Sequence, residues 1–273
     1  MASALSSISG CAAFVTGGAS GIGFGIAQAL ADAGARIALA DVDRSALDAA
    51  ADRLRSAGAT VLPLVLDVRQ AEAWQSAAEQ AEAELGSVQL LFSNAGVLGS
   101  RLPLEQTSVD AWRWTFDINV EGSLHAIRTF VPRMRRSGQP GHVVITASLG
   151  GFLVQPANGL YSATKGAVIA MAESLRGELA GSSIGVSVLC PGLVRSNLHD
   201  NARKLAPPGL SLGPEEPELV AALKQSMDPR AVGEMVLDGI LARRFWLFTH
   251  PELAPLVEQR SREILAAMGR PET

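Results

Sequence analysis

Short apolar runs alternate along this chain with longer stretches in which apolar residues recur at helical spacing. The runs predict strands at residues 11–15, 36–40, 61–66, 88–92, 143–146, 184–189 and 245–248. The longer stretches predict helices at 22–33, 45–56, 72–85, 109–134, 160–180 and 228–242, with a last helix ending near 268. Such alternation is typical of a parallel sheet covered by helices on both faces. We therefore expect an α/β fold with a doubly wound sheet of about seven strands.

Polar residues and glycines follow the predicted strands where each of them ends. The strand ends are marked by Asp41, Asp67, Asn94, Ser148 and the pair Pro191-Gly192. In a parallel sheet these carboxyl ends meet at one edge, where ligands of open α/β sheets bind. The sequence thus predicts a site at this edge.

Residues 197–226 interrupt the alternation and are rich in proline, with Pro207-Pro208-Gly209 and a second group from Pro214 to Glu218. A long irregular insert in a compact domain is usually a functional lid or a disordered loop. Its place after the Pro191-Gly192 strand end favours a substrate lid. Since no linker or repeat divides the chain, we expect one domain over residues 1–273.

A glycine-rich turn joins the first predicted strand to the first helix, with Gly17, Gly21 and Gly23 in the segment TGGASGIG. Glycines allow a pyrophosphate to approach the backbone, and the helix N-terminus offers free N–H groups. Asp41 ends the second strand, where a carboxylate can bind the ribose hydroxyls of NAD and repel the 2′-phosphate of NADP. Arg44 nearby weakens that preference. Alternatively, the glycine-rich segment is a plain flexible turn without a phosphate ligand, and Asp41 is a residue at the entry to the next helix.

Composition and charge exclude several classes of partner. The formal net charge is −4, so nothing at the level of the whole chain attracts nucleic acid or anionic lipid. No apolar run reaches the length of about 18 residues that spans a bilayer, and the N-terminus does not resemble a signal peptide. The four scattered histidines lack metal-ligand spacing, and the two cysteines fit core positions. We therefore expect a cytoplasmic protein with a small-molecule substrate and no metal.

Tyr161 and Lys165 lie four residues apart on a predicted helix and so share one face. Oxidising an alcohol with NAD requires the protein to take a proton, and a tyrosine can do so if its pKa falls from about 10. The ammonium of Lys165 and the positive nicotinamide ring would both favour the phenolate. Ser148 can orient the substrate oxygen. Tyr161 is the only tyrosine, although an ordinary helix tyrosine would show the same spacing.

Together these motifs resemble the short-chain dehydrogenase/reductase family, in its single-domain branch with a Rossmann-type fold. Residues 16–23 match TGxxxGxG, residues 161–165 match YxxxK, and Ser148 lies 13 residues before Tyr161. Residues 93–96 match NNAG with Ser93 in first place, and residues 191–196 match PGxVxT with Ser196 in last place. The resemblance implies that Asn119 is the fourth catalytic residue, on a water-linked proton path to Lys165. It also implies a homodimer or homotetramer.

Three sets of site residues follow. The catalytic set is Ser148, Tyr161, Lys165 and Asn119. The coenzyme set, part of which rests on the resemblance, is Gly17, Ser20, Gly21, Ile22, Gly23, Asp41, Asp67, Val68, Asn94, Ala95, Gly96, Tyr161, Lys165, Pro191, Gly192, Val194 and Ser196. The substrate set, by position, is Ser148, Leu149, Gly150, Phe152, Leu153, Asn158, Leu160, Tyr161, Leu193 and Leu198. Most residues of the substrate set are apolar and none is charged, which disfavours a polyanionic substrate.

These sets predict an NAD-dependent oxidoreductase that interconverts a secondary alcohol and a ketone, with a bulky hydrophobic or aromatic substrate. The pattern is also similar to aryl-alcohol dehydrogenases of aromatic degradation. One alternative is a non-catalytic NAD-sensing scaffold, although such proteins typically lose the tyrosine or lysine. Another is a sugar-nucleotide epimerase or dehydratase, although those usually have TGxxGxxG spacing and a longer C-terminal domain.

Overall fold

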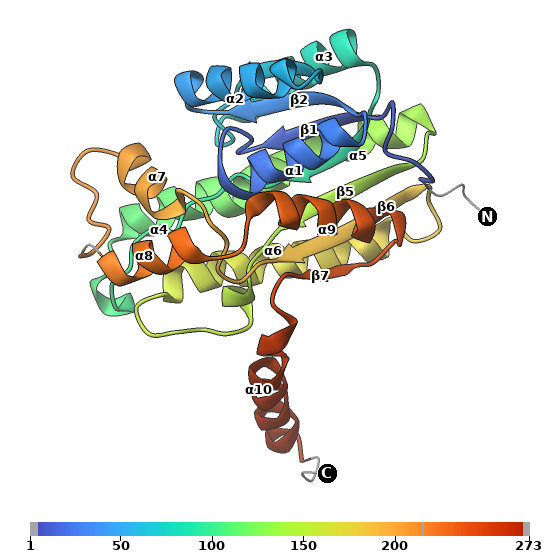
Figure 1. Ribbon diagram of the computed structural model, residues 1–273. Coiled ribbons are helices and arrows are strands. Elements are labelled where there is room, and N and C mark those ends of the chain that lie inside the picture. Colours follow the sequence, from blue (N-terminus) through green and yellow to red (C-terminus); the bar gives the residue numbers. More distant parts are fainter. Residues whose placement is uncertain (1–4, 215, 270–273) are drawn as a thin grey trace.

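Seven parallel strands form one sheet in the order β3-β2-β1-β4-β5-β6-β7 (Figure 1). The computed structural model describes residues 5–214 and 216–269. Residues 1–4, part of the segment that does not resemble a signal peptide, and Glu215 of the insert lie outside the described residues. The strands are β1 (Ala12–Thr16), β2 (Arg36–Asp41), β3 (Thr60–Val65), β4 (Val88–Ser93), β5 (Gly141–Thr146), β6 (Ile184–Cys190) and β7 (Trp246–Phe248). The predicted Rossmann-type α/β fold is confirmed.

Helices cover both faces of this sheet. One face packs against α3 (Ala71–Leu85), α5 (Gly122–Ser137) and α6 (Gly159–Glu178). The other face packs against α1 (Gly21–Asp32), α2 (Arg44–Ser56) and α9 (Pro229–Leu241). The strands are rich in apolar residues because both faces of the sheet are covered, and all six residues of β5 are buried.

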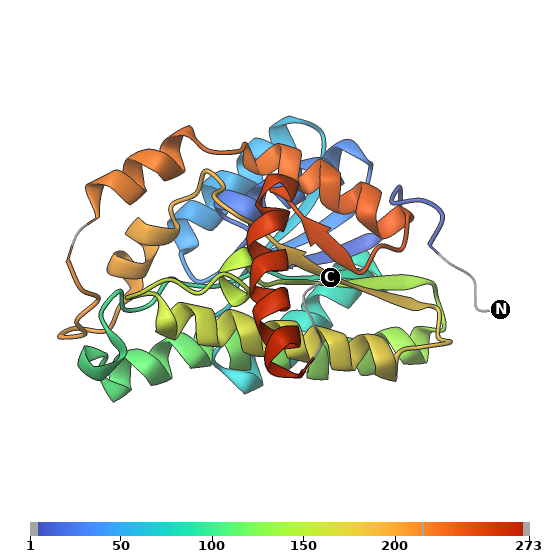
Figure 2. The same cartoon turned by 90° about the horizontal axis from the view of Figure 1, so that it is seen from below.

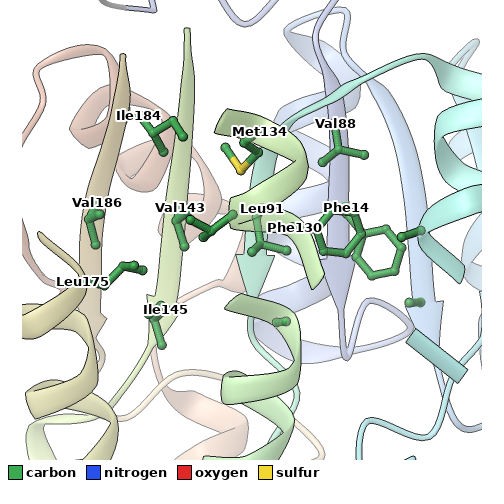
Figure 3. Packing of buried hydrophobic residues seen from close by; sticks show 14 of the residues in the cluster. Phe14, Val88, Leu91, Phe130, Met134, Val143, Ile145, Leu175, Ile184 and Val186 are labelled. Carbon is green, nitrogen blue, oxygen red and sulfur yellow. The ribbon is translucent and has the colours of Figure 1, made fainter. Parts of the chain in front are cut away.

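Aliphatic side chains build most of the core, and a few aromatic rings pack among them. Phe14 on β1 lies against Phe130 on α5 with ring centroids 4.6 Å apart, and Trp74 on α3 completes the group. Figure 3 shows this cluster continuing through Val143 and Ile145 of β5 toward β6. The packed face fixes the strands and therefore the loops that leave their carboxyl ends.

The long helix predicted over 109–134 is instead two helices joined by a wider turn. α4 (Val109–Phe116) and α5 are separated by the π-helical turn Asp117–Glu121. Such a turn holds one extra residue, which a pattern of apolar spacing does not reveal, and it is frequent at functional sites. Asn119 lies inside it.

The insert at 197–226 also differs from the irregular segment that its prolines suggest. It contains α7 (Leu198–Leu205) and α8 (Pro217–Gln225), which lie together at one end of the molecule in both views (Figures 1 and 2). Pro217 occupies the first turn of α8, where its missing N–H needs no partner. A bridge between Val194 and Met227 closes the base of the insert. The prolines thus bound the helices and do not prevent them.

The last helix, α10 (Ala254–Ala267), extends away from the rest of the fold (Figure 1). None of its residues is buried within the described chain, and Leu256, Ile264 and Leu265 are between 41% and 50% exposed. Among the residues described, no helix combines the length and the apolar character needed to cross a bilayer.

Candidate active site

A cavity of about 610 Å³ opens at the carboxyl edge of the sheet, between the ends of β1 and β4. Strand order reverses direction there, since β1 continues to β2 on one side and β4 to β5 on the other. This is the place where open α/β sheets bind ligands. The residues predicted from sequence that line it are Gly17, Ser20, Gly21, Ile22, Asp41, Asp67, Val68, Asn94, Ala95, Gly96, Ser148, Leu149, Gly150, Leu153, Asn158, Tyr161, Lys165, Pro191, Gly192, Leu193, Val194, Ser196 and Leu198.

The glycine-rich turn forms a cradle that side chains would fill. Gly17 has φ +62° and Gly21 has φ +51°, a region that glycine adopts at little cost. Gly23, which belongs to the predicted coenzyme set, does not itself line the cavity. A Cβ on Gly23 would lie 2.1 Å from the Gly17 carbonyl oxygen, so Gly23 acts by letting α1 start against the turn. The cradle leaves the backbone N–H groups at the start of α1 accessible, which fits a pyrophosphate.

Thr16 and Asn94 hold this turn against the end of β4. The Thr16 hydroxyl accepts hydrogen bonds from the backbone N–H groups of Asn94 (2.9 Å) and Ala95 (3.1 Å). The Asn94 amide donates to the Thr16 carbonyl at 3.1 Å, while its oxygen accepts from Thr146 at 3.2 Å. Asn94 therefore links the ends of β1, β4 and β5 beside the cavity.

The Asp41 carboxylate faces the cavity and also closes the turn. Its Oδ2 accepts from the Ala19 N–H at 3.1 Å, and its Oδ1 accepts from the Asp43 N–H at 3.1 Å. Burial raises the pKa of Asp41 above its ordinary value, and the backbone N–H donors oppose that shift by stabilising the anion. The neighbouring Arg44 guanidinium is instead paired with Asp48 at 3.6 Å. A carboxylate thus stands at the position predicted to meet the ribose.

Asp67 and Val68, which follow β3, line the same cavity. The Asp67 carboxylate pairs with Arg69, whose Nη2 lies 2.6 Å from Oδ2. That hydrogen bond holds the pKa of Asp67 below its ordinary value despite partial burial. Asp67 therefore remains an anion that can accept hydrogen bonds.

Ser148, Tyr161 and Lys165 converge at the other end of the cavity. Ser148 follows β5, and its Oγ accepts from the Gly150 N–H at 3.0 Å. Tyr161 and Lys165 come from α6, with the Lys165 Nζ 5.7 Å from the centroid of the phenol ring. Lys165 donates to the Thr146 carbonyl at 2.9 Å, which fixes the ammonium beside the end of β5. Side chains from the end of β5 and from α6 thus lie together at this end of the cavity.

Burial changes the pKa values of these groups. Burial raises the pKa of Tyr161 above its ordinary value, and its hydrogen bond with Ser148 opposes this. The pKa of Lys165 falls from 10.5 to about 8 because burial disfavours the ammonium. The expectation of a lowered tyrosine pKa therefore does not hold for the chain by itself, since desolvation of the phenolate outweighs the Ser148 contact.

Asn119 is 1% exposed and lies behind the site, not in it. Its Oδ1 accepts from the Val97 N–H at 2.8 Å, and its Nδ2 donates to the Val97 carbonyl at 2.9 Å and to Thr164 Oγ1 at 3.0 Å. Both amide hydrogens are used by these contacts. Within the described chain the side chain therefore braces the segment after β4 against α6, and a part in proton transfer stays a prediction.

Two residues of the predicted substrate set point elsewhere. Phe152 packs against Trp246 and Phe248 of β7, with ring centroids 5.7 Å and 6.0 Å away. Leu160 is 1% exposed and does not line the cavity. Both predictions were wrong, because position along the chain does not tell which way a side chain turns.

The cavity wall also contains residues that sequence reasoning missed. Trp114 of α4, Leu219 and Leu223 of α8, and Leu253 at the base of α10 extend its apolar surface. Arg101, after β4, lines the cavity as well and adds a charged residue to the uncharged substrate set predicted from sequence. The helical spacing of 219 and 223 within the insert could have revealed an apolar face; nothing local singles out Arg101.

Comparisons with known proteins agree with this geometry. The sequence profile of the short chain dehydrogenase family matches residues 11–206. The chain is 36% identical to the C alpha-dehydrogenase of Sphingobium sp., over 94% of this chain and 86% of that one. It is also 36% identical to the 1-deoxy-11-beta-hydroxypentalenate dehydrogenase of Streptomyces avermitilis, over 94% and 91%. A crystal structure of a short chain dehydrogenase/reductase from Burkholderia phymatum in complex with NAD superposes with a TM-score of 0.90, at 34% identity over 98% of both chains.

Proposed function

The chain belongs to the short-chain dehydrogenase/reductase family of oxidoreductases, and we propose that it uses NAD(H) to interconvert a bulky, largely apolar secondary alcohol and its ketone. One observation carries the proposal: Ser148, Tyr161 and Lys165 meet at the apolar end of a cavity whose other end is a glycine cradle with Asp41. The presence of the tyrosine and the lysine argues against a scaffold without catalysis. Within the described residues, the chain after Lys165 completes the sheet with β6 and β7 and adds the lid helices α7 and α8, so a separate substrate domain of the epimerase kind is not favoured.

The chemistry divides between the coenzyme and the protein. When bound, the nicotinamide coenzyme accepts or donates the hydride. Ser148 would hold the substrate oxygen, and the Tyr161 phenol would take the hydroxyl proton in oxidation and return it in reduction. Lys165, beside the phenol, would stabilise the phenolate by its charge. Its pKa of about 8 lets it exchange a proton near neutral pH.

We assign the preference for NAD over NADP to Asp41. A 2′-phosphate at the end of β2 would meet this carboxylate. The nearby cations are already paired, Arg44 with Asp48 and Lys204 of α7 with Asp43. The neighbour from Burkholderia phymatum holds NAD, which supports the same assignment for this chain.

The substrate class follows from the apolar wall of the cavity. Leu149, Leu153, Leu193 and the leucines of α7 and α8 surround the catalytic end. Such a surface favours a hydrophobic or aromatic group attached to the carbinol carbon and disfavours a sugar or a polyanion. The related dehydrogenase from Streptomyces avermitilis is named for a hydroxylated substrate, which supports the reaction class.

The proposal is tested by NADH formation at alkaline pH across a panel of secondary alcohols, with NADP compared in the same assay. We expect turnover of aromatic alcohols with NAD, and a fall of at least a hundredfold in Tyr161→Phe. A phenylalanine retains the ring, so NADH binding measured by fluorescence serves as the control for folding. Undiminished turnover in the variant, or turnover confined to small polar sugars, would contradict the proposal.

We further propose a cytoplasmic homodimer or homotetramer, as the family resemblance implies. The apolar side chains of α10 support an assembly because a helix of 14 residues without packing partners is marginally stable in water. Light scattering coupled to size exclusion checks this, since the monomer mass is 28.5 kDa. A mass near that value would contradict the assembly.

A further inference from the structure

A cation lies in the largely apolar wall at the substrate end of the cavity. Arg101 follows β4, its side chain is 19% exposed, and it lines the cavity together with Val97, Leu98 and Trp114. Placing a charged group in such a wall costs free energy unless it is paired and hydrogen-bonded. The reaction described above gives this residue no part.

Two contacts hold the guanidinium in place. Its Nε donates to Glu216 Oε1 at 2.7 Å, and its Nη1 donates to Asn158 Oδ1 at 3.0 Å. Glu216 directly precedes α8 of the lid, and Asn158 directly precedes α6, three residues before Tyr161. The guanidinium is therefore fixed between the lid and the first turn of the helix that carries the phenol.

These contacts leave hydrogen-bond donors available. Arginine has five N–H donors and two of them are used. Across residues 5–214 and 216–269, no side-chain or backbone acceptor pairs with Nη2. A ligand oxygen in the cavity can therefore accept from the guanidinium without breaking either contact.

We propose that Arg101 determines specificity by donating a hydrogen bond to a neutral oxygen on the part of the substrate away from the reacting carbon. An ether, phenol or carbonyl oxygen fits, because Glu216 already balances the charge of Arg101 and a carboxylate would add a second anion beside it. The inference rests on the proposed function, since it takes the alcohol to face Tyr161.

The backbone around Arg101 allows the side chain to be tested separately from the lid. The Arg101 N–H donates to the Leu212 carbonyl at 3.0 Å, and Gly213 lies so close that a Cβ on it would be 2.9 Å from the Arg101 carbonyl oxygen. The contact between this segment and the insert therefore persists when the side chain is replaced. Methionine keeps a long flexible chain without donors.

The test compares 1-(4-methoxyphenyl)ethanol, 1-phenylethanol and 4-(1-hydroxyethyl)benzoate as substrates, with NAD. We expect Arg101→Met to lower the kcat/KM ratio of the methoxy to the unsubstituted alcohol by about tenfold, the effect of one charged hydrogen bond. Comparing ratios cancels the electronic effect of the substituent. Arg113→Met, at an exposed position on α4, is the matched control and should leave the ratio unchanged.

The variant Glu216→Gln tests the role of the Glu216 carboxylate in excluding an anionic substrate. Removing the lid carboxylate should raise turnover of the benzoate relative to wild type, since Arg101 then lacks its balancing anion. A ratio in Arg101→Met within twofold of wild type, or a wild-type preference for the benzoate, overturns the inference while the reaction class stands. Absence of turnover with all three alcohols instead removes the proposed function, and the inference with it.

Discussion

Replacing Asn119 with alanine separates a structural role from a chemical one. The side chain makes three buried hydrogen bonds, two to the backbone of Val97 and one to Thr164. The variant leaves the N–H and the carbonyl of Val97 without partners, while the Thr164 hydroxyl keeps its bond to the Tyr161 carbonyl at 2.7 Å. Each buried group left unpaired costs about 1–3 kcal/mol. We expect a total loss of about 2–5 kcal/mol in the free energy of unfolding.

For a chain of this length each kcal/mol corresponds to about 2 °C in Tm, so Asn119→Ala should melt about 4–10 °C below wild type in calorimetry. Thr164→Val removes only one of the three partners and should lower Tm by about 2 °C. If Asn119→Ala melts within 1 °C of wild type while turnover collapses, the bracing argument is wrong and Asn119 acts in proton transfer.

Three further predictions concern other parts of the chain. Gly23→Ala places a Cβ 2.1 Å from the Gly17 carbonyl oxygen, so NADH affinity measured by fluorescence should fall at least tenfold, and unchanged affinity would contradict the cradle. Burial lowers the pKa of His142 from 6.5 to about 4. Between these two pH values the unfolded chain binds a proton at His142 and the folded chain does not, so the free energy of unfolding falls as pH drops through that range. Compared with His142→Gln, wild type should lose up to about 3 kcal/mol more between pH 6.5 and 4 in denaturant titrations; equal losses would show that His142 does not titrate in this way. Lys204→Ala removes the ion pair between the lid and Asp43 and should raise the KM for NAD several-fold with little change in kcat, whereas a fall in kcat alone would place the effect elsewhere.

Local patterns determined much of this protein. Each strand predicted from an apolar run is present, because burial on both faces of a parallel sheet leaves a direct trace in the sequence. The glycine spacing of residues 17–23 and the four-residue step from Tyr161 to Lys165 are also local. Such features follow from backbone geometry over one turn or one helix, so most of the residues that line both ends of the cavity could be predicted from sequence.

Tertiary packing decided the direction of individual side chains and the structure of the insert. Phe152 turned toward β7 and not toward the cavity, because aromatic partners were available there from a strand almost a hundred residues later. Asn119 came to lie in a π-helical turn whose extra residue leaves the apolar spacing of the flanking helices intact. The insert folded into two helices, and Leu198 and Leu205 of α7 and Leu219 and Leu223 of α8 line the cavity.

Arg101 is the clearest example of a residue whose role depends on tertiary contacts and not on local sequence. Nothing within ten residues of it distinguishes a cation that lines the cavity from one that faces water. Its role depends on Glu216, 115 residues away, and Asn158, 57 residues away. The sequence by itself determined the order of strands and helices, the glycine-rich turn and the shared helix face of Tyr161 and Lys165, because apolar runs, glycine spacing and a four-residue helical step are local features. The tertiary structure decided which further residues complete the cavity wall, among them Arg101, Trp114, Leu219 and Leu223, because segments far apart in the sequence bring them together.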